Sequence, residues 1–93
     1  MGNLSQLVKL DVDTNSLTGT LPRELANLTQ LQWLDVHHNT LSGTIPVQLT
    51  SLSQLIALDL DTNNLTGSVP RELANLTQLL ELNLGNNHLN GTV

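Results

Sequence analysis

Apolar and polar positions along this chain repeat with a period of 24 residues. Two leucine columns show the period, and they consist of Leu4, Leu28, Leu52 and Leu76 and of Leu10, Leu34, Leu58 and Leu82. An asparagine column follows at Asn15, Asn39, Asn63 and Asn87. Buried positions that recur at a fixed period predict stacked coils, each of which covers the apolar edge of its neighbour. We therefore predict a solenoid that forms a single domain over residues 1–93, with about four repeats, the last truncated, and no caps.

Each repeat contains a short alternation of apolar and polar residues. Leu10, Asp11 and Val12 alternate in the way that is typical of a strand with one buried face. The same pattern in the other repeats predicts four short parallel strands. The asparagine of each repeat can both donate and accept hydrogen bonds, so we expect a buried asparagine ladder that satisfies turn amides between coils.

The rest of each repeat predicts a turn and a short helical segment. In the first repeat, Gly19 permits a positive φ and Pro22 fixes φ and removes a donor, so the chain turns there. Leu25 and Leu28 are spaced three residues apart, as in a short helical or 3₁₀ segment. With one strand and one such segment per coil, the expected fold class is an α/β solenoid.

The combined motif resembles a known repeat family. The sequence Leu-Thr-Gly-Thr-Leu-Pro-Arg-Glu-Leu-Ala-Asn-Leu-Thr-Gln-Leu, joined to the strand core, is similar to the plant-type leucine-rich repeat over essentially the whole chain. The resemblance implies a right-handed superhelix with a concave parallel β-sheet and short 3₁₀, helical or irregular convex segments. It also implies a role in binding peptides, proteins or other ligands, as in receptor-kinase ectodomains and polygalacturonase-inhibiting proteins.

One departure from that family concerns cysteine. Family members usually carry paired cysteines in capping segments, whereas this chain has none. We interpret the chain as an excised, engineered or self-associating piece, with possible pairing of copies through uncapped ends. The compartment stays open, although a receptor-type ectodomain would be extracellular.

The distribution of charge predicts the kind of partner. The net charge is −5. The charged residues that sum to this value all fall at strand positions expected to face solvent on the concave side. These residues are Lys9, Asp11, Asp13, Asp35, Asp59, Asp61 and Glu81. A basic protein or peptide is therefore the expected partner, and nucleic acid is disfavoured. No apolar stretch is long enough to span a bilayer, so we expect no membrane partner.

Two rows of ionisable residues stand out on the predicted sheet. Asp11, Asp35 and Asp59 are expected about 4.8 Å apart on adjacent strands, where a cation, a partner's Lys or Arg, or shared protons would relieve their repulsion. A second row is expected to place His37 between Asp13 and Asp61.

Together with His38, this second row offers ligand types suited to zinc or nickel. Consecutive strand residues point to opposite faces, so His37 and His38 cannot both enter one coordination shell unless the strand has already ended before them. We therefore assign no metal and no cofactor, and interpret the histidines as salt-linked surface groups.

Trp33 completes the candidate site. It shares a column with Lys9, Ala57 and Glu81, so we expect it exposed on the concave face as an aromatic anchor. The predicted ligand-binding residues are Trp33, Asp35, His37, Asp11, Asp13, Asp59 and Asp61.

Catalysis is not expected, because the chain has no cysteine nucleophile, no phosphate-binding glycine loop and no pocket predicted around its acids. The function we favour is non-catalytic recognition of a protein or peptide. A self-associating structural or engineered scaffold without a ligand remains open. Ice binding is a further alternative, and it would use an array formed by Thr18, Thr20, Ser42, Thr44, Thr66 and Ser68.

Overall fold

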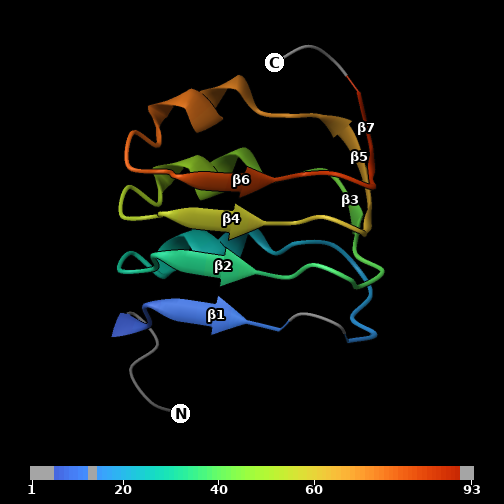
Figure 1. Ribbon diagram of the computed structural model, residues 1–93, viewed down its shortest axis with the longest axis horizontal. Helices are drawn as coiled ribbons and strands as arrows, with labels where there is room; N and C mark the ends of the chain where they lie inside the picture. Colours follow the sequence, from blue (N-terminus) through green and yellow to red (C-terminus); the bar gives the residue numbers. More distant parts are fainter. Residues whose placement is uncertain (1–5, 13–14, 91–93) are drawn as a thin grey trace.

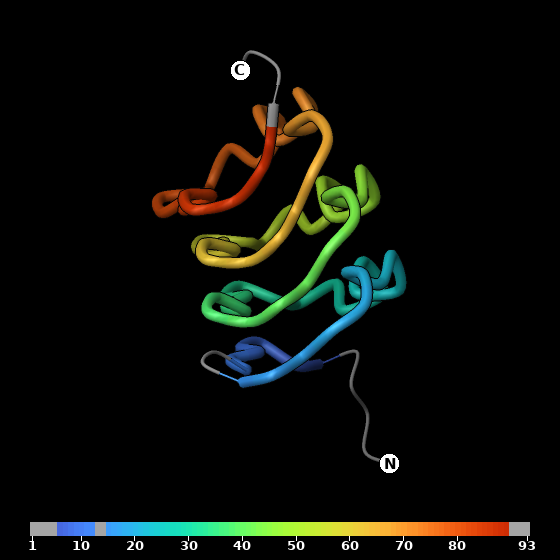
Figure 2. Tube along the Cα trace, turned by 90° about the vertical axis from the view of Figure 1, so that its right-hand side faces the viewer, coloured from blue at the N-terminus to red at the C-terminus, as the bar shows by residue number. Residues whose placement is uncertain are grey.

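Each repeat closes into one coil, and the coils stack into the predicted solenoid (Figures 1 and 2). The computed structural model describes residues 6–12 and 15–90, with the side chain of Asn90 excluded. Figure 2 shows the strands at one edge of the stack and the short helices at the opposite edge. The solenoid prediction is therefore confirmed.

The main sheet contains one strand from each coil. Its strands are β1 (Lys9–Asp11), β2 (Trp33–Asp35), β4 (Ala57–Asp59) and β6 (Glu81–Asn83), in the order β1-β2-β4-β6. All neighbours are parallel, and Leu10, Leu34, Leu58 and Leu82 pair in register. The four parallel strands and their register were predicted correctly from the leucine columns.

A second parallel sheet, which the sequence analysis did not predict, runs along the side of the stack. It consists of β3 (Ser42–Gly43), β5 (Asn64–Ser68) and β7 (His88–Asn90). Thr20 joins β3 through an isolated bridge to Ser42. Its register is shifted from the repeat, because Ser42 pairs with Asn64 rather than with the equivalent residue Thr66.

The opposite edge of the stack is formed by 3₁₀ helices, as predicted. They are η2 (Arg23–Asn27), η3 (Val47–Ser51) and η4 (Arg71–Asn75). Each begins directly after a proline, namely Pro22, Pro46 or Pro70, and the backbone of Pro22 and Pro46 is extended. Proline fixes φ before the first turn, and Leu49 and Leu73 then point into the core.

The core is a column of leucines whose burial depends on position in the stack. Leu34 and Leu58, in the middle coils, are 0% exposed, whereas the equivalent Leu82 in the last described coil is 44% exposed. Leu10 in the first coil is only half-buried. Because each coil buries its neighbour, the middle coils are covered on both sides and the outer coils on one.

The predicted asparagine ladder is present, but only Asn39 and Asn63 are buried, whereas Asn87 is half-buried and Asn15 is exposed. The Nδ2 group of Asn63 donates to the main-chain carbonyls of Val36, Leu60 and Asp61, and its Oδ1 accepts from the N–H of Leu41. Asn39 and Asn87 make equivalent bonds in their own coils. Each side chain therefore joins its own turn to the preceding coil.

Candidate functional site

The outward side of the main sheet, which we call the front face, carries the predicted site residues. Strand pairing places Asp11, Asp35 and Asp59 opposite one another, so the expected row of carboxylates is present. Asp11 is exposed, and Asp35 and Asp59 are half-buried. Asp13 lies outside the described residues. The front face thus brings together most of the predicted set.

Two carboxylates of the row also accept hydrogen bonds from main-chain N–H groups just beyond the ends of their strands. Oδ1 of Asp35 accepts a hydrogen bond from the N–H of His37 at 3.1 Å, and Oδ1 of Asp59 accepts one from Asp61 at 3.3 Å. Asn83 makes the same bond to the N–H of Gly85 at 3.3 Å. Sequence reasoning missed this role, although Asp or Asn side chains are known to bond to the backbone two residues on. Since Asn83 does the same, the bond does not require a carboxylate.

The imidazole ring of His37 lies against two carboxylates of the aspartate row. Its Nδ1 hydrogen-bonds to Oδ1 of Asp35 and lies 3.6 Å from Oδ2 of Asp59. His37 was predicted to lie between Asp13 and Asp61. Asp13 is outside the described residues, and the charge of His37 does lower the pKa of Asp61, but the ring hydrogen-bonds to Asp35 of the other row. The difference follows from the Asp35 bond to the His37 N–H, which brings ring and carboxylate together. We call Asp35, His37 and Asp59 the His37 cluster.

Two carboxyl groups near this ring have shifted pKa values. Burial, followed by a hydrogen bond to Asp61, raises the pKa of Asp59 to about 6. The pKa of Asp61 is lowered, mainly by its hydrogen bond with Asp59 and also by Thr62 and the charge of His37. Asp59 therefore keeps its proton to a higher pH than an ordinary carboxyl group, whereas Asp61 ionises more readily.

His38 does not belong to the cluster. Its backbone is left-handed, with φ of 60°, and its ring centroid lies 6.1 Å from that of His37 in an edge-on arrangement. Thr62 and Asn86 occupy the equivalent position with similar positive φ values. The backbone itself therefore separates the two neighbouring imidazoles.

Trp33 is exposed as predicted, whereas Ala57, which was also expected to be exposed, is buried. The Trp33 side chain is 40% exposed, and Nζ of Lys9 lies 5.5 Å from the centroid of its ring, within cation–π range. Ala57 was expected to face solvent, yet it is only 1% exposed. Its register partners are Trp33 and Glu81, and the small methyl group is covered because its neighbours are much larger.

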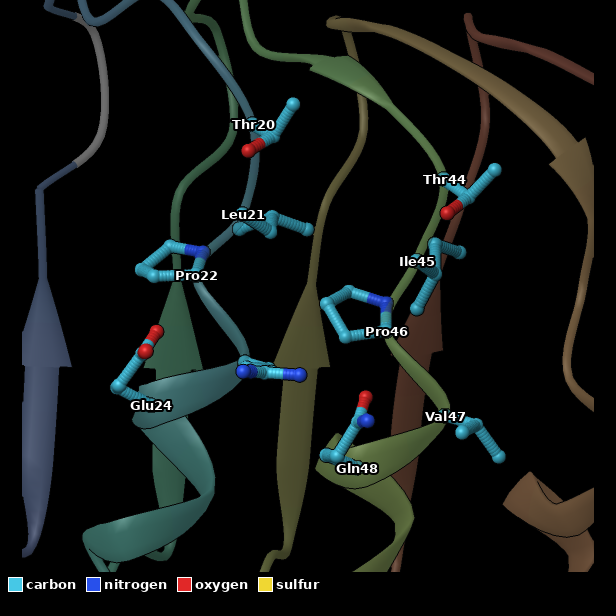
Figure 3. Close-up of a pocket in the computed structure, with 10 residues that line it drawn as sticks. Thr20, Leu21, Pro22, Glu24, Thr44, Ile45, Pro46, Val47 and Gln48 are labelled. Carbon is cyan, nitrogen blue, oxygen red and sulfur yellow. The ribbon is translucent and has the colours of Figure 1, made fainter.

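Two hollows in the described part of the chain lie away from the front face. One, of about 740 Å³, lies between two consecutive coils, and Figure 3 shows the side chains that line it, from Thr20–Glu24 and Thr44–Gln48. The other, of about 440 Å³, lies in the last coils and is lined mostly by apolar residues. Its lining consists of Val69, Pro70, Arg71, Leu73, Ala74, Leu82 and Leu84. The His37 cluster lines neither of these two hollows.

The repeats match a known family model, described as Leucine Rich Repeat, at residues 6–28, 30–52 and 54–76. The chain belongs to the leucine-rich repeat family. The leucine-rich repeat fold of receptors and binding proteins is non-catalytic, so the expectation that this chain is not an enzyme is confirmed. A search of curated proteins finds no match.

Solved structures of plant leucine-rich repeat proteins superpose closely on this chain. The plant peptide hormone receptor RGFR1, in complex with RGF2, is 43% identical with a TM-score of 0.94, over 96% of this chain and 14% of the receptor. The ectodomain of GASSHO1/SCHENGEN3 from Arabidopsis thaliana is 40% identical with a TM-score of 0.94, over 97% of this chain and 11% of its own. These matches confirm the resemblance to plant receptor-kinase ectodomains.

A plant ice-binding protein is a third structural match. It is 34% identical with a TM-score of 0.87, over 89% of this chain and 27% of that protein. The chain thus spans between 11% and 27% of the length of these three proteins. Among its described residues, no helix has the length and apolarity needed to cross a membrane.

Proposed function

We propose that this chain is a peptide- or protein-binding leucine-rich repeat module whose front face takes a basic partner. The observation that carries the proposal is the exposed Trp33 beside a fixed row of carboxylates on an open sheet. Aromatic residues at such positions are frequent hot spots, because they bury a large apolar area at low entropic cost.

The charge of the front face supports a basic partner. The arginines and glutamates of η2 and η4 compensate each other, so the net charge of −5 resides at the front-face sequence positions. A lysine or arginine of a partner would relieve the repulsion between Asp11, Asp35 and Asp59. It would also compete with Lys9 for the Trp33 ring.

The matched structures support a protein or peptide as the ligand class. RGFR1 and HAESA were solved with the peptide hormones RGF2 and IDA, and BIR3 was solved in a complex with SERK2. For this chain, recognition of a peptide or protein is an inference from that likeness and from its own front face.

The proposal is tested with labelled lysine- and arginine-rich peptides and acidic peptides of equal length, measured by fluorescence anisotropy. We expect the basic peptides to bind, and Trp33→Ala to weaken binding by about tenfold or more. Asp35→Asn is expected to weaken it too, whereas Glu72→Gln on η4 removes the same charge from the far edge and serves as the matched control. Binding that is absent, or that responds equally to Asp35→Asn and Glu72→Gln, contradicts the proposal.

A second candidate is self-association through the ends of the stack. Leu80 is 87% exposed, Leu82 is partly exposed, and the apolar hollow of about 440 Å³ lies beside them. At the other end, Val8 and Leu17 are exposed. Sedimentation of the free protein separates the two candidates, because a monomer at high concentration excludes the scaffold function, and a large assembly that binds no peptide excludes recognition.

Ice binding is less favoured than either candidate, although one matched structure is an ice-binding protein. The register of the second sheet aligns Thr20 with Ser42 and then with Asn64, while Thr66 pairs with His88. The exposed array therefore lacks the regular row of threonine and serine that this function would need.

A further inference from the structure

We propose that Asp35, His37 and Asp59 form a binding site for a divalent transition metal ion of the zinc class. The site would supply one imidazole nitrogen and two carboxylate oxygens, with water completing the shell. It would lie beside Trp33 on the front face, and its metal binding does not depend on the identity of a peptide partner.

The donor atoms are already close enough to share an ion. One ligand atom from each of the three residues lies within 4.8 Å of the others, and Nδ1 of His37 is 3.6 Å from Oδ2 of Asp59. Two ligands about 2.1 Å from one zinc ion lie roughly 3–3.5 Å apart in tetrahedral or octahedral geometry. Small side-chain rotations are therefore sufficient to form the site.

The backbone restrains the donors before any ion binds. Asp35 and Asp59 lie in register on adjacent strands. The Oδ1 atom of each also accepts a main-chain N–H, which restricts the rotation of its carboxylate. All three side chains are half-buried, so they are partly shielded from solvent. A site held by strands loses less freedom on binding than one built on loops.

The donor set selects the class of metal. Imidazole nitrogen suits zinc, copper and nickel, whereas calcium and magnesium prefer all-oxygen shells. Three protein ligands with one or more solvent positions are typical of open zinc sites. The proton that Nδ1 carries in the metal-free protein would pass to Nε2 or to water, since a metal-bound nitrogen is unprotonated.

The sequence-based objection to a metal does not apply to this set. That objection concerned His37 and His38 entering one shell, and His38 is indeed turned away by its left-handed backbone. The third ligand is instead supplied by a carboxylate of the neighbouring strand. An ion there would also compensate the repulsion within the aspartate row.

The test is isothermal titration of the untagged, chelator-treated chain with zinc chloride, at a pH above the pKa of Asp59. We expect one ion per chain with a dissociation constant in the micromolar range. Asp35→Asn and Asp59→Asn should each weaken binding by about tenfold or more. Both variants should fold, because Asn83 makes the same strand-end bond with an amide side chain. His37→Gln should abolish the binding.

Two matched controls make the result specific. Asp11→Asn removes a charge from the same row without removing a ligand, and His38→Gln removes the neighbouring imidazole. Both should bind zinc as the unchanged chain does, also in the presence of excess calcium. The proposal is overturned if zinc does not bind, or if the controls lose as much affinity as Asp35→Asn and Asp59→Asn. Retained binding in both of those ligand variants overturns it as well.

Discussion

Asn63 shows how a single side chain can link two coils. It donates to carbonyls of its own turn at Leu60 and Asp61, and to the carbonyl of Val36 in the preceding coil. It also accepts the N–H of Leu41. Its side chain is buried, so water cannot replace these bonds if the amide is removed.

Asn63→Ala is therefore expected to lower the free energy of unfolding by about 2–4 kcal/mol, because buried donors and acceptors would be left unsatisfied. Urea denaturation followed by circular dichroism measures the change. Asn15→Ala is the matched control, since Asn15 occupies the same column in the first coil but is exposed. A loss as large in the control would mean that burial does not determine the effect.

The hydrogen-bonding role of Asn63 could be predicted from the sequence, whereas the direction of the His37 ring could not. An asparagine column implies its role, because the same residue recurs where coils must exchange hydrogen bonds. The direction of the His37 ring depends on the bond between Asp35 and the His37 N–H, and on the left-handed backbone of His38. The Asp35 bond recurs at Asp59, but Asp61 and Gly85 take the place of His37, and Thr62 and Asn86 take the place of His38, so no column of histidines marks the position.

The glycine turns determine how closely neighbouring coils approach. Gly19, Gly43 and Gly67 have φ values of 87°, 80° and 82°. A Cβ on Gly67 would lie 2.8 Å from Cγ2 of Thr44 in the preceding coil, whereas a Cβ on Gly19 would meet no atom within 4 Å. Gly67 is thus required both for its backbone conformation and for the space it leaves.

Gly19→Ala is expected to cost about 1–2 kcal/mol of stability from backbone strain alone. Gly67→Ala is expected to cost about 2–4 kcal/mol, because the overlap with Thr44 adds to the strain. Adding Thr44→Ser to Gly67→Ala removes the methyl group and should recover part of the loss. Chemical denaturation of the three variants checks the order, and equal losses in the two alanine variants would contradict it.

The second sheet could not be predicted from the sequence, because its strands depend on contacts between coils rather than on local residue preference. The segment of β5 contains Thr66-Gly67-Ser68, and these residue types usually indicate a turn. Its strand conformation depends on bonds between coils, such as Asn64 N–H to the carbonyl of Leu41. Local sequence carries no sign of such a partner, whereas the main sheet was predictable from its alternating leucines.

The stability of the whole stack depends on pH, because burial shifts the pKa of Asp59 on the main sheet. Asp59 in the folded protein has a pKa of about 6, against an ordinary value of 3.8, so it holds a proton that the unfolded chain releases. The stability from Asp59 is therefore complete below about pH 4 and is lost as the pH rises through about 6. Asp61 acts in the opposite sense, since its lowered pKa contributes stability that is lost in stronger acid.

We therefore expect the unfolding temperature to fall as the pH rises from about 4 to about 7, most steeply between about pH 4 and pH 6, where Asp59 is protonated in the folded protein and ionised in the unfolded chain. A change of about 1 kcal/mol corresponds to roughly 4–8 °C in a domain of this size, which thermal circular dichroism resolves. The scans need a chelator, because a bound ion would stabilise the ionised cluster.

Asp59→Asn should flatten the profile and raise the unfolding temperature at neutral pH, because a neutral amide keeps the bond to Asp61 without the charge. Glu72→Gln, on the far edge of the stack, should leave the profile unchanged. The groups that face Asp59 are Asp35, His37 and Asp61. A His37→Gln scan separates its contribution, and a slope that survives in Asp59→Asn but disappears in His37→Gln would assign the pH dependence to the imidazole instead.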